Sequence, residues 1–263
     1  NKFLFYYPLS LLMLLGIRDI NLISDNSNIN NFKKLLGDGS QYGIKLNYIL
    51  QDSPNGIAES LVLKKEINEK DDVALILGDN IFYGSNIYKI INDKLVRTMK
   101  SNKSLIVVLE SNEPEKFGNA VFDDNEKIIN IEEKPKKPKS NKIVTGLYFY
   151  KKGTYKIVEK QKPNISKNNE LCITDLNCEL IKQDKLDYLS LGRGFTWFDS
   201  GTYDGYLRAC NFIKIIESKS NELIGSIEEV ALRKNFIDKK KYLNLVRNYK
   251  NEEYRETLLK INP

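Results

Sequence analysis

Two aspartates follow patterns that are typical of strand ends. Asp79 comes after residues 73–77, five apolar residues that predict a buried parallel strand ending at Gly78. Asp199 lies in the segment FTWFDSG, more than a hundred residues later. Open α/β sheets bind ligands beyond the carboxyl ends of their strands, and two carboxylates there would form a hard oxygen site suited to Mg²⁺ on a phosphorylated substrate. The alternative is that each aspartate only caps the turn or helix that follows it.

The composition restricts the classes of function. A chain of 263 residues with 41% apolar content buries a full core and fits one large α/β domain or two smaller ones. The net charge of +6, from 41 basic and 35 acidic residues, is weak support for a polyanionic partner. The one dense basic run, residues 134–142 (KPKKPKSNK), contains two prolines and no interleaved aromatic residue. It predicts a solvated loop, and we expect no nucleic acid as a partner.

Histidine is absent, which excludes His-based zinc sites, Ser-His-Asp triads and a histidine general base. The three cysteines, Cys172, Cys178 and Cys210, have no metal-ligand spacing. An odd cysteine count without a secretion signal favours a reducing, cytoplasmic location. The apolar opening at residues 3–17 is too short to span a bilayer, so we predict a buried first helix and no membrane partner.

The elements that must position the two aspartates alternate between helix and strand in the first half of the chain. Strand patterns at 19–24, 44–50, 73–77 and 105–110 are interleaved with helical patterns at 7–16, 30–36, 57–66 and 86–99. This order predicts a mainly parallel sheet covered by helices on both faces.

The pattern changes after Glu110. Residues 119–122 and 127–131 predict a hairpin, and 144–150 is a β-rich run with Gly146 inside it, marking either a close approach of a ligand or backbone, or a bulge. Further patterns predict helices at 153–160, 174–183 and 203–218, a strand at 186–191, and short helices from residue 227. We therefore expect one α/β domain at 1–218 and a helical tail at 219–263 packed on it, since no linker requires a second independent domain.

Seven segments, taken in order, resemble the glucose-1-phosphate thymidylyltransferases of the short bacterial type, within the sugar-nucleotide pyrophosphorylases. They are YYPLSLLMLLGIRDI (6–20), LLGDGSQYGIKLNY (35–48), QDSPNGIAES (51–60), LGDNIFYG (77–84), IEEKPKKPKSN (131–141), GLYFY (146–150) and FTWFDSGTYDGYLRA (195–209). The combination is specific, whereas any one segment alone is not. The resemblance implies a three-layer, Rossmann-like nucleotide-diphospho-sugar transferase fold with a mostly parallel central sheet, an inserted β-hairpin region and a helical C-terminal tail.

The resemblance also implies a reaction. The phosphate of glucose 1-phosphate attacks the α-phosphorus of dTTP, giving dTDP-glucose and pyrophosphate for deoxysugar synthesis of the dTDP-rhamnose type. Such an in-line displacement depends on positioning and charge neutralisation. Asp79 and Asp199 match the family's two carboxylates for Mg²⁺, and Lys134 in the Glu-Lys-Pro segment matches the lysine that holds the sugar phosphate.

Other positions match the family's substrate-binding residues. Gln51 and Gly56 match the segment that reads the thymine base, and the Gln51 amide offers both a donor and an acceptor to a pyrimidine edge. Those matching the hexose pocket are Gly118, Glu133, Val144, Gly146, Tyr148 and Trp197. Taken without the resemblance, Gln51 would be an exposed loop residue and Trp197 a core residue. Tyr83 and Gly84 lie where the family has a second, regulatory nucleotide site.

One departure concerns the start of the chain. The family begins with a strand and a glycine-rich loop of the form GGxGTRLxPxT followed by a lysine, and that loop wraps the triphosphate. Asn1 aligns just after it. We therefore expect this polypeptide as written to have negligible activity and to expose apolar sheet edges, and a version with the loop restored to be active.

Two other functions compete with this interpretation. A sister nucleotidyltransferase would use UTP, CTP or ATP with the same machinery. A nonenzymatic sugar-nucleotide binder or assembly subunit would explain the missing loop, but it would not need Asp79, Asp199 and Lys134. A dehydrogenase is disfavoured because no GxGxxG follows a predicted strand. The resemblance further implies a cytoplasmic homotetramer.

Overall fold

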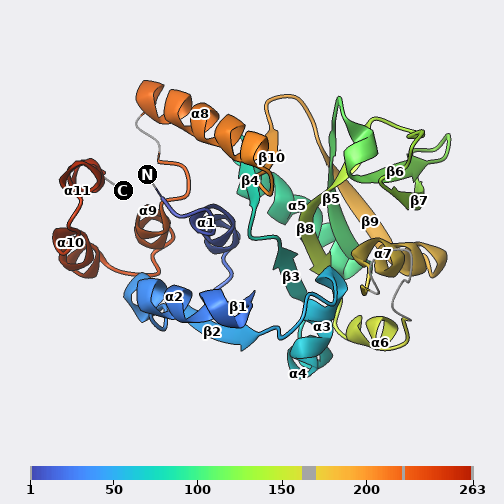
Figure 1. The fold of residues 1–263 in the computed structure, drawn as a ribbon, viewed down its shortest axis with the longest axis horizontal. Coiled ribbons are helices and arrows are strands. Elements are labelled where there is room, and N and C mark those ends of the chain that lie inside the picture. The colour runs from blue at the N-terminus through green and yellow to red at the C-terminus, as the bar shows by residue number, and fades with distance from the viewer. Residues whose placement is uncertain (1, 162–169, 221–222, 262–263) are drawn as a thin grey trace. The chain divides into compact units, whose positions relative to one another are not determined.

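A computed structural model describes residues 2–161, 170–220 and 223–261 of the chain (Figure 1). The described residues form two compact units. The first comprises Asn1–Asp52, Gly78–Tyr83 and Phe198–Pro263, and the second comprises Ser53–Leu77 and Gly84–Trp197. Asp79 and Asp199 both belong to the first unit.

The first unit begins with the buried helix that the apolar opening predicted. Helix α1 (Tyr6–Leu14) buries six consecutive residues, from Pro8 to Met13, which requires packing on all of its sides. Two residues after the helix comes Gly16, whose φ of +90° suits glycine and which donates its N–H to the carbonyl of Met13. Helix α1 contacts α9 (Ile227–Arg233) and β4 (Asn80–Tyr83).

A strand–helix–strand segment follows in the same unit. Strands β1 (Asp19–Ser24) and β2 (Lys45–Leu50) pair in parallel, from Asp19 opposite Lys45 to Ser24 opposite Leu50. Between them lie α2 (Asn26–Leu36), which is capped by Asp25, and the short 3₁₀ helix η1 (Ser40–Tyr42). The strand predictions hold to within one residue, whereas α2 begins four residues before the predicted start.

The rest of the first unit packs α8 (Tyr203–Lys219) against β4. Strand β4 pairs with β10 (Thr196–Asp199), and Ile81 of β4 is buried with Ala209 and Ile213 of α8. The predicted short helices after residue 227 are α9, α10 (Lys239–Arg247) and α11 (Glu252–Leu259).

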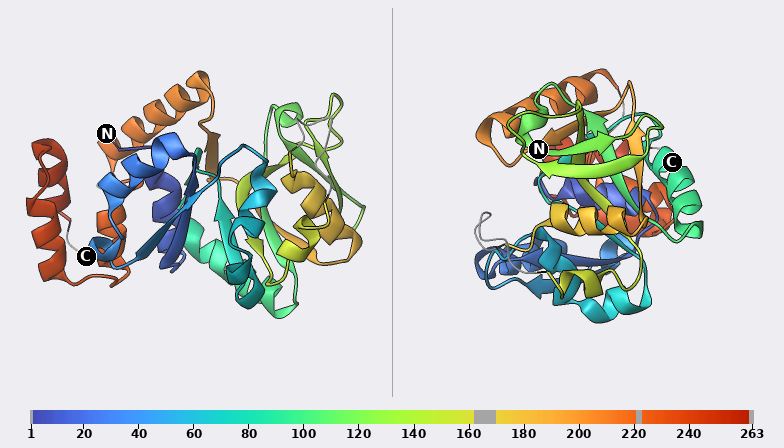
Figure 2. Two further views of the ribbon diagram at one scale, coloured as in Figure 1. Left: turned by 60° about the horizontal axis from the view of Figure 1, so that its bottom comes forward. Right: turned by 90° about the vertical axis from the view of Figure 1, so that its right-hand side faces the viewer.

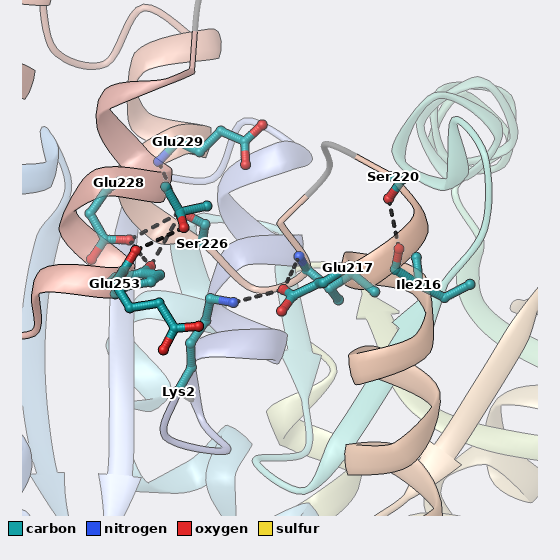
Figure 3. A network of polar contacts seen from close by, with 11 residues as sticks. Lys2, Ile216, Glu217, Ser220, Ser226, Glu228, Glu229 and Glu253 are labelled. Atoms are coloured by element: carbon teal, nitrogen blue, oxygen red, sulfur yellow. Dashed lines mark hydrogen bonds and ion pairs between the residues drawn. The ribbon is translucent and has the colours of Figure 1, made fainter.

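Polar side chains join these helices inside the first unit (Figure 3). Lys2, whose side chain is 2% exposed, forms an ion pair of 2.8 Å with Glu217 of α8. Glu228 of α9 is fully buried and accepts hydrogen bonds from the hydroxyls of Tyr254 (3.0 Å), Ser226 (3.2 Å) and Tyr249. A buried carboxylate is costly unless its oxygens are hydrogen-bonded, so these hydroxyls stabilise the packing of the C-terminal helices.

The second unit contains a six-stranded sheet in the order β7-β6-β8-β5-β9, with β3 also paired to β8. Its strands are β3 (Val73–Ile76), β5 (Ser104–Glu110), β6 (Gly118–Phe122), β7 (Ile128–Glu133), β8 (Lys142–Tyr150) and β9 (Leu186–Leu191). Strands β6 and β7 form the predicted hairpin, drawn in green in Figure 2. Residues 105–108 of β5 are all 0% exposed, so both faces of this strand are covered, as expected for an α/β sheet.

The described sheets are mixed in direction. Strands β1–β2 and β5–β9 pair in parallel, as the alternating pattern predicted. Strand β8 runs antiparallel to β3, β5 and β6, because the chain returns through it after the hairpin. The strand at 73–77 was expected to be buried and parallel; β3 is instead half-buried and pairs with an antiparallel neighbour.

The helices of the second unit differ from the predictions mainly in their ends. The helical pattern at 57–66 is divided into η2 (Ile57–Glu59), α3 (Ser60–Leu63) and α4 (Lys65–Lys70), because Lys64 leaves the helical region with φ of −136°. Helix α6 (Tyr155–Val158) is shorter than predicted. Helices α5 (Ile87–Lys100) and α7 (Ile173–Lys182) lie close to their predicted positions, and η3 (Pro114–Lys116) precedes β6. In the described part of the chain, no helix has the length and apolar character needed to cross a membrane.

Candidate functional site

Asp79 lies in the turn that links β3 to β4. Its backbone carbonyl accepts a hydrogen bond of 2.9 Å from the N–H of Ser200, which ties this turn to the one after β10. Its side-chain Oδ1 accepts a hydrogen bond of 2.8 Å from Nδ2 of Asn80. One carboxylate oxygen is therefore held by a neighbouring amide.

Asp199 is the last residue of β10. Its Oδ1 accepts a hydrogen bond of 3.0 Å from the N–H of Gly201, so the carboxylate does stabilise the following turn, as the capping alternative proposed. It does not cap α8, because Thr202 performs that role through the N–H of Gly205. A β-carbon on Gly205 would lie 2.2 Å from the carbonyl oxygen of Asp199, so the start of α8 packs directly on the strand end.

The two carboxylates converge in front of Gly201. A β-carbon built on Gly201 would lie 2.9 Å from Oδ2 of Asp79 and 3.2 Å from Oδ1 of Asp199. Both side chains thus reach the same small volume, which glycine leaves open. The fold brings together two residues that are 120 positions apart in the sequence.

This arrangement fits a hard divalent cation. Oxygen ligands are those that Mg²⁺ prefers, and Mg²⁺ is typically held by one or two carboxylates, with substrate phosphates and water completing its shell. The described residues contain no group of three or more potential metal-ligating side chains, so substrate would have to supply the remaining ligands. Next to Asp199, the buried hydroxyl of Ser200 has no hydrogen-bond partner in the described part of the chain.

Two of the predicted hexose residues, Glu133 and Val144, lie beside a third, Gly118. Gly118 lies opposite Glu133 in the β6–β7 ladder, and a β-carbon on it would lie 3.6 Å from Oε2 of Glu133 and 3.7 Å from Cβ of Val144. Burial raises the pKa of the Tyr148 phenol, and the nearby Glu133 carboxylate adds to this, so the phenol stays protonated.

Lys134 follows directly on β7 and is exposed. Its φ of +44° lies in the left-handed region, which residues other than glycine rarely adopt, and its N–H donates to the carbonyl of Phe117 at 3.1 Å. Such strain persists only where the surroundings enforce it, and it is frequent at functional sites. The ring of Trp197 packs edge-on against Phe117 at a centroid distance of 5.1 Å.

The structure shows the surroundings of two glycines that the sequence analysis singled out. Gly56 has φ of +101°, and a β-carbon there would lie 2.4 Å from the carbonyl oxygen of Leu171, so a neighbouring backbone requires it. Gly146 accepts a hydrogen bond from the N–H of Leu77 at 2.9 Å. The β5–β8 register shifts between Ile106 and Val108, opposite this part of β8, which is the bulge that was one of the two alternatives.

Two residues that were not predicted from the sequence, Thr174 and Phe117, contact residues that were. Thr174 donates a short hydrogen bond from its hydroxyl to Oε2 of Glu133, and Phe117 supports both Lys134 and Trp197. Nothing in their local patterns distinguishes them from core residues, since their partners are distant in sequence. Gln51, at the end of β2, belongs to the first unit with Asp79 and Asp199, whereas Gly56 and the hexose residues belong to the second.

Residues 1–215 match the family Nucleotidyl transferase. The chain belongs to this family. The nucleotidyl transferases most similar to it include the glucose-1-phosphate thymidylyltransferase of Neisseria meningitidis, which is 38% identical over 99% of this chain and 89% of the relative. The enzyme of the same name from Mycobacterium tuberculosis is 35% identical over 99% of this chain and 88% of the relative.

Solved nucleotidyl transferase structures confirm the α/β fold. A Bacillus anthracis protein assigned as a glucose-1-phosphate thymidylyltransferase, solved with sucrose, has a TM-score of 0.71 and 32% identity, covering 80% of this chain and 81% of that one. A UDP-glucose pyrophosphorylase in complex with UDP-glucose has a TM-score of 0.69 and covers 83% of this chain and 88% of that one. Its identity of 20% supports the fold alone.

Proposed function

We propose that this protein transfers a thymidylyl group from dTTP to glucose 1-phosphate, giving dTDP-glucose and pyrophosphate. The observation that supports it best is the convergence of Asp79 and Asp199 on the open position at Gly201, in a chain whose relatives are named for this activity. We also propose Mg²⁺ as the cation, since the donor set is two carboxylates.

In this reaction an oxygen of the glucose 1-phosphate phosphate bonds to the α-phosphorus of dTTP. The bond from the α-phosphorus to its bridging oxygen breaks, and pyrophosphate leaves with the electron pair. Mg²⁺ held by Asp79 and Asp199 would supply positive charge to the triphosphate. The protein's own contribution is to orient the reacting groups and to neutralise charge, which is the main requirement of phosphoryl chemistry.

The residues of the second unit have roles in binding the sugar phosphate in this proposal. Lys134 supplies a compact cation to the phosphate of glucose 1-phosphate. Glu133 accepts hydrogen bonds from hexose hydroxyls, and its contact with Thr174 fixes the orientation of its carboxylate. Tyr148 remains a neutral donor because burial keeps its pKa high.

Base recognition is assigned to Gln51 and Gly56, with thymine as the preferred base. A regulatory nucleotide site at Tyr83 and Gly84 stays a prediction; in this structure a β-carbon on Gly84 would lie 2.1 Å from the ring of Phe195. The homotetramer, the cytoplasmic location and the supply of dTDP-glucose to deoxysugar synthesis for surface polysaccharides also stay predictions.

Calorimetric titration with dTDP-glucose, with and without Mg²⁺, tests the enzyme against the nonenzymatic binder. We expect Mg²⁺ to tighten binding by tenfold or more in the wild type, and this gain to disappear in Asp199→Asn. The matched control is Asp204→Asn, an exposed acid that pairs with Arg208 on α8. Binding that is equally tight without metal, in both the wild type and Asp199→Asn, would favour the binder.

A further inference from the structure

Asn80 is a buried amide beside one of the two carboxylates. It is the first residue of β4, and only 2% of it is exposed. A buried amide is costly unless it is hydrogen-bonded, and Asn80 donates from Nδ2 to Oδ1 of Asp79 at 2.8 Å. A hydrogen bond to an ionised carboxylate is stronger than one between neutral groups.

This hydrogen bond fixes the orientation of the Asp79 carboxylate relative to Gly201. Because Oδ1 is occupied by the Asn80 amide, it is Oδ2 that lies 2.9 Å from the position of a β-carbon on Gly201. The terminal torsion of aspartate is broad and roughly two-fold, so a half-turn only exchanges equivalent oxygens, whereas a partial rotation would break the bond to Asn80. The amide therefore restrains the carboxylate.

The two aspartates are held by different kinds of donor. Asp199 is oriented by the backbone N–H of Gly201, which any substitution at that position except proline retains. Asp79 is held by the side chain of Asn80, so its restraint can be removed by mutation.

We infer that Asn80 is a positioning residue, which holds Oδ2 of Asp79 toward the point that it shares with Oδ1 of Asp199 and so sets the affinity for the cation. The inference rests on the proposed metal pair. Groups that orient metal ligands in this way typically change metal affinity or activity 10–100-fold when they are mutated.

The test measures Mn²⁺ affinity by electron paramagnetic resonance, alone and with dTTP, together with thermal unfolding midpoints. Asn80→Leu keeps the volume of the side chain but has no donor. Asn80→Ser keeps a hydroxyl donor but leaves a cavity. We expect a 10–100-fold weaker Mn²⁺ affinity in Asn80→Leu and a smaller loss in Asn80→Ser, even where Asn80→Ser is the less stable variant.

Asn47→Leu is the matched control. Asn47 of β2 donates from Nδ2 to Oδ1 of Asp19, also at 2.8 Å, and Asp19 is not one of the two proposed metal ligands, so its loss should leave Mn²⁺ affinity unchanged. Wild-type affinity in Asn80→Leu, or losses that simply follow the unfolding midpoints, would overturn the inference. Mn²⁺ binding that survives both Asp79→Asn and Asp199→Asn would instead refute the metal pair, and the inference with it.

Discussion

Gly201→Ala should weaken cation binding tenfold or more while leaving the fold intact. The added methyl would lie 2.9 Å from Oδ2 of Asp79 and 3.2 Å from Oδ1 of Asp199, both closer than an ordinary van der Waals contact. A Mg²⁺ ion needs oxygen distances of about 2.0–2.1 Å, so the methyl occupies the volume in which both carboxylates would meet the ion. Because the atoms that the methyl would contact are carboxylate oxygens at the ends of side chains, either side chain can rotate away from it.

The magnitude follows from these contacts. If one carboxylate turns away, the site keeps only one of its two protein ligands. We then expect metal affinity to fall tenfold to a hundredfold, which is a loss of about 1.4–2.8 kcal/mol in binding free energy. The free energy of unfolding should change by less than about 1 kcal/mol. Gly201 does not have a left-handed φ, and replacing glycine with alanine lowers the entropy of the unfolded chain.

Mn²⁺ titration of Gly201→Ala, combined with urea unfolding, measures both quantities. Gly192→Ala is the control, because a β-carbon on Gly192 has no atom within 4 Å and its φ is also outside the left-handed region. Mn²⁺ affinity in Gly201→Ala equal to that of the control would refute the convergence of the two carboxylates on a cation.

Three further variants test other contacts. Tyr249→Phe removes a donor to the buried carboxylate of Glu228 and should lower the free energy of unfolding by about 1–3 kcal/mol in urea titrations. Burial acts to raise the pKa of Asp187, but the hydrogen bond from Lys94 and its other donors outweigh this and hold the pKa below its ordinary 3.8. The resulting stabilisation is present above the unfolded-state pKa and is lost as the pH falls through the folded-state pKa. Asp187→Asn should therefore lower the free energy of unfolding by about 1 kcal/mol at pH 7, and by less below about pH 4. In steady-state kinetics of the loop-restored version, Lys134→Ala should raise KM for glucose 1-phosphate about tenfold or more, with a smaller change for dTTP, because it removes the cation assigned to the sugar phosphate.

Each of these variants has a control or a contradicting outcome. Tyr203 is 81% exposed, so Tyr203→Phe should leave stability unchanged where Tyr249→Phe does not. A stability loss in Asp187→Asn that stays constant from pH 7 to pH 3 would show that the charge of Asp187 is not the cause. An equal rise in KM for both substrates in Lys134→Ala would contradict the assignment of this lysine to the sugar phosphate.

Local pattern was enough to predict many elements of the fold. Strands β1 (DINLIS) and β9 (LDYLSL) have the predicted ends, and in both of them apolar residues are interspersed with polar ones, as in a half-buried strand. The hairpin of β6 and β7 was predicted from the residues of its turn. The break at Lys64 and the antiparallel direction of β8 were not predicted, since they depend on tertiary neighbours rather than on local period.

The same limit applies to the candidate site. The sequence pattern raised Asp79 and Asp199 as a possible carboxylate pair, with capping as the alternative, and the resemblance assigned both of them to Mg²⁺. Three features could not be predicted from the sequence, because each depends on which atoms face one another in the fold. They are the open volume at Gly201, the amide of Asn80 and the hydroxyl of Thr174. Gly201, which the sequence analysis did not single out, leaves the space in which both carboxylates meet.

The reaction itself is the most direct test of the central claim. A version of the protein with the family's glycine-rich loop restored is incubated with Mg²⁺, glucose 1-phosphate and, separately, dTTP, UTP, CTP or ATP, and ³¹P NMR follows pyrophosphate and the sugar nucleotide. We predict equal amounts of dTDP-glucose and pyrophosphate, formed fastest with dTTP and lost in Asp199→Asn. Equal or faster turnover with UTP would contradict the thymidylyl assignment, and no pyrophosphate with any nucleotide would contradict the proposed function.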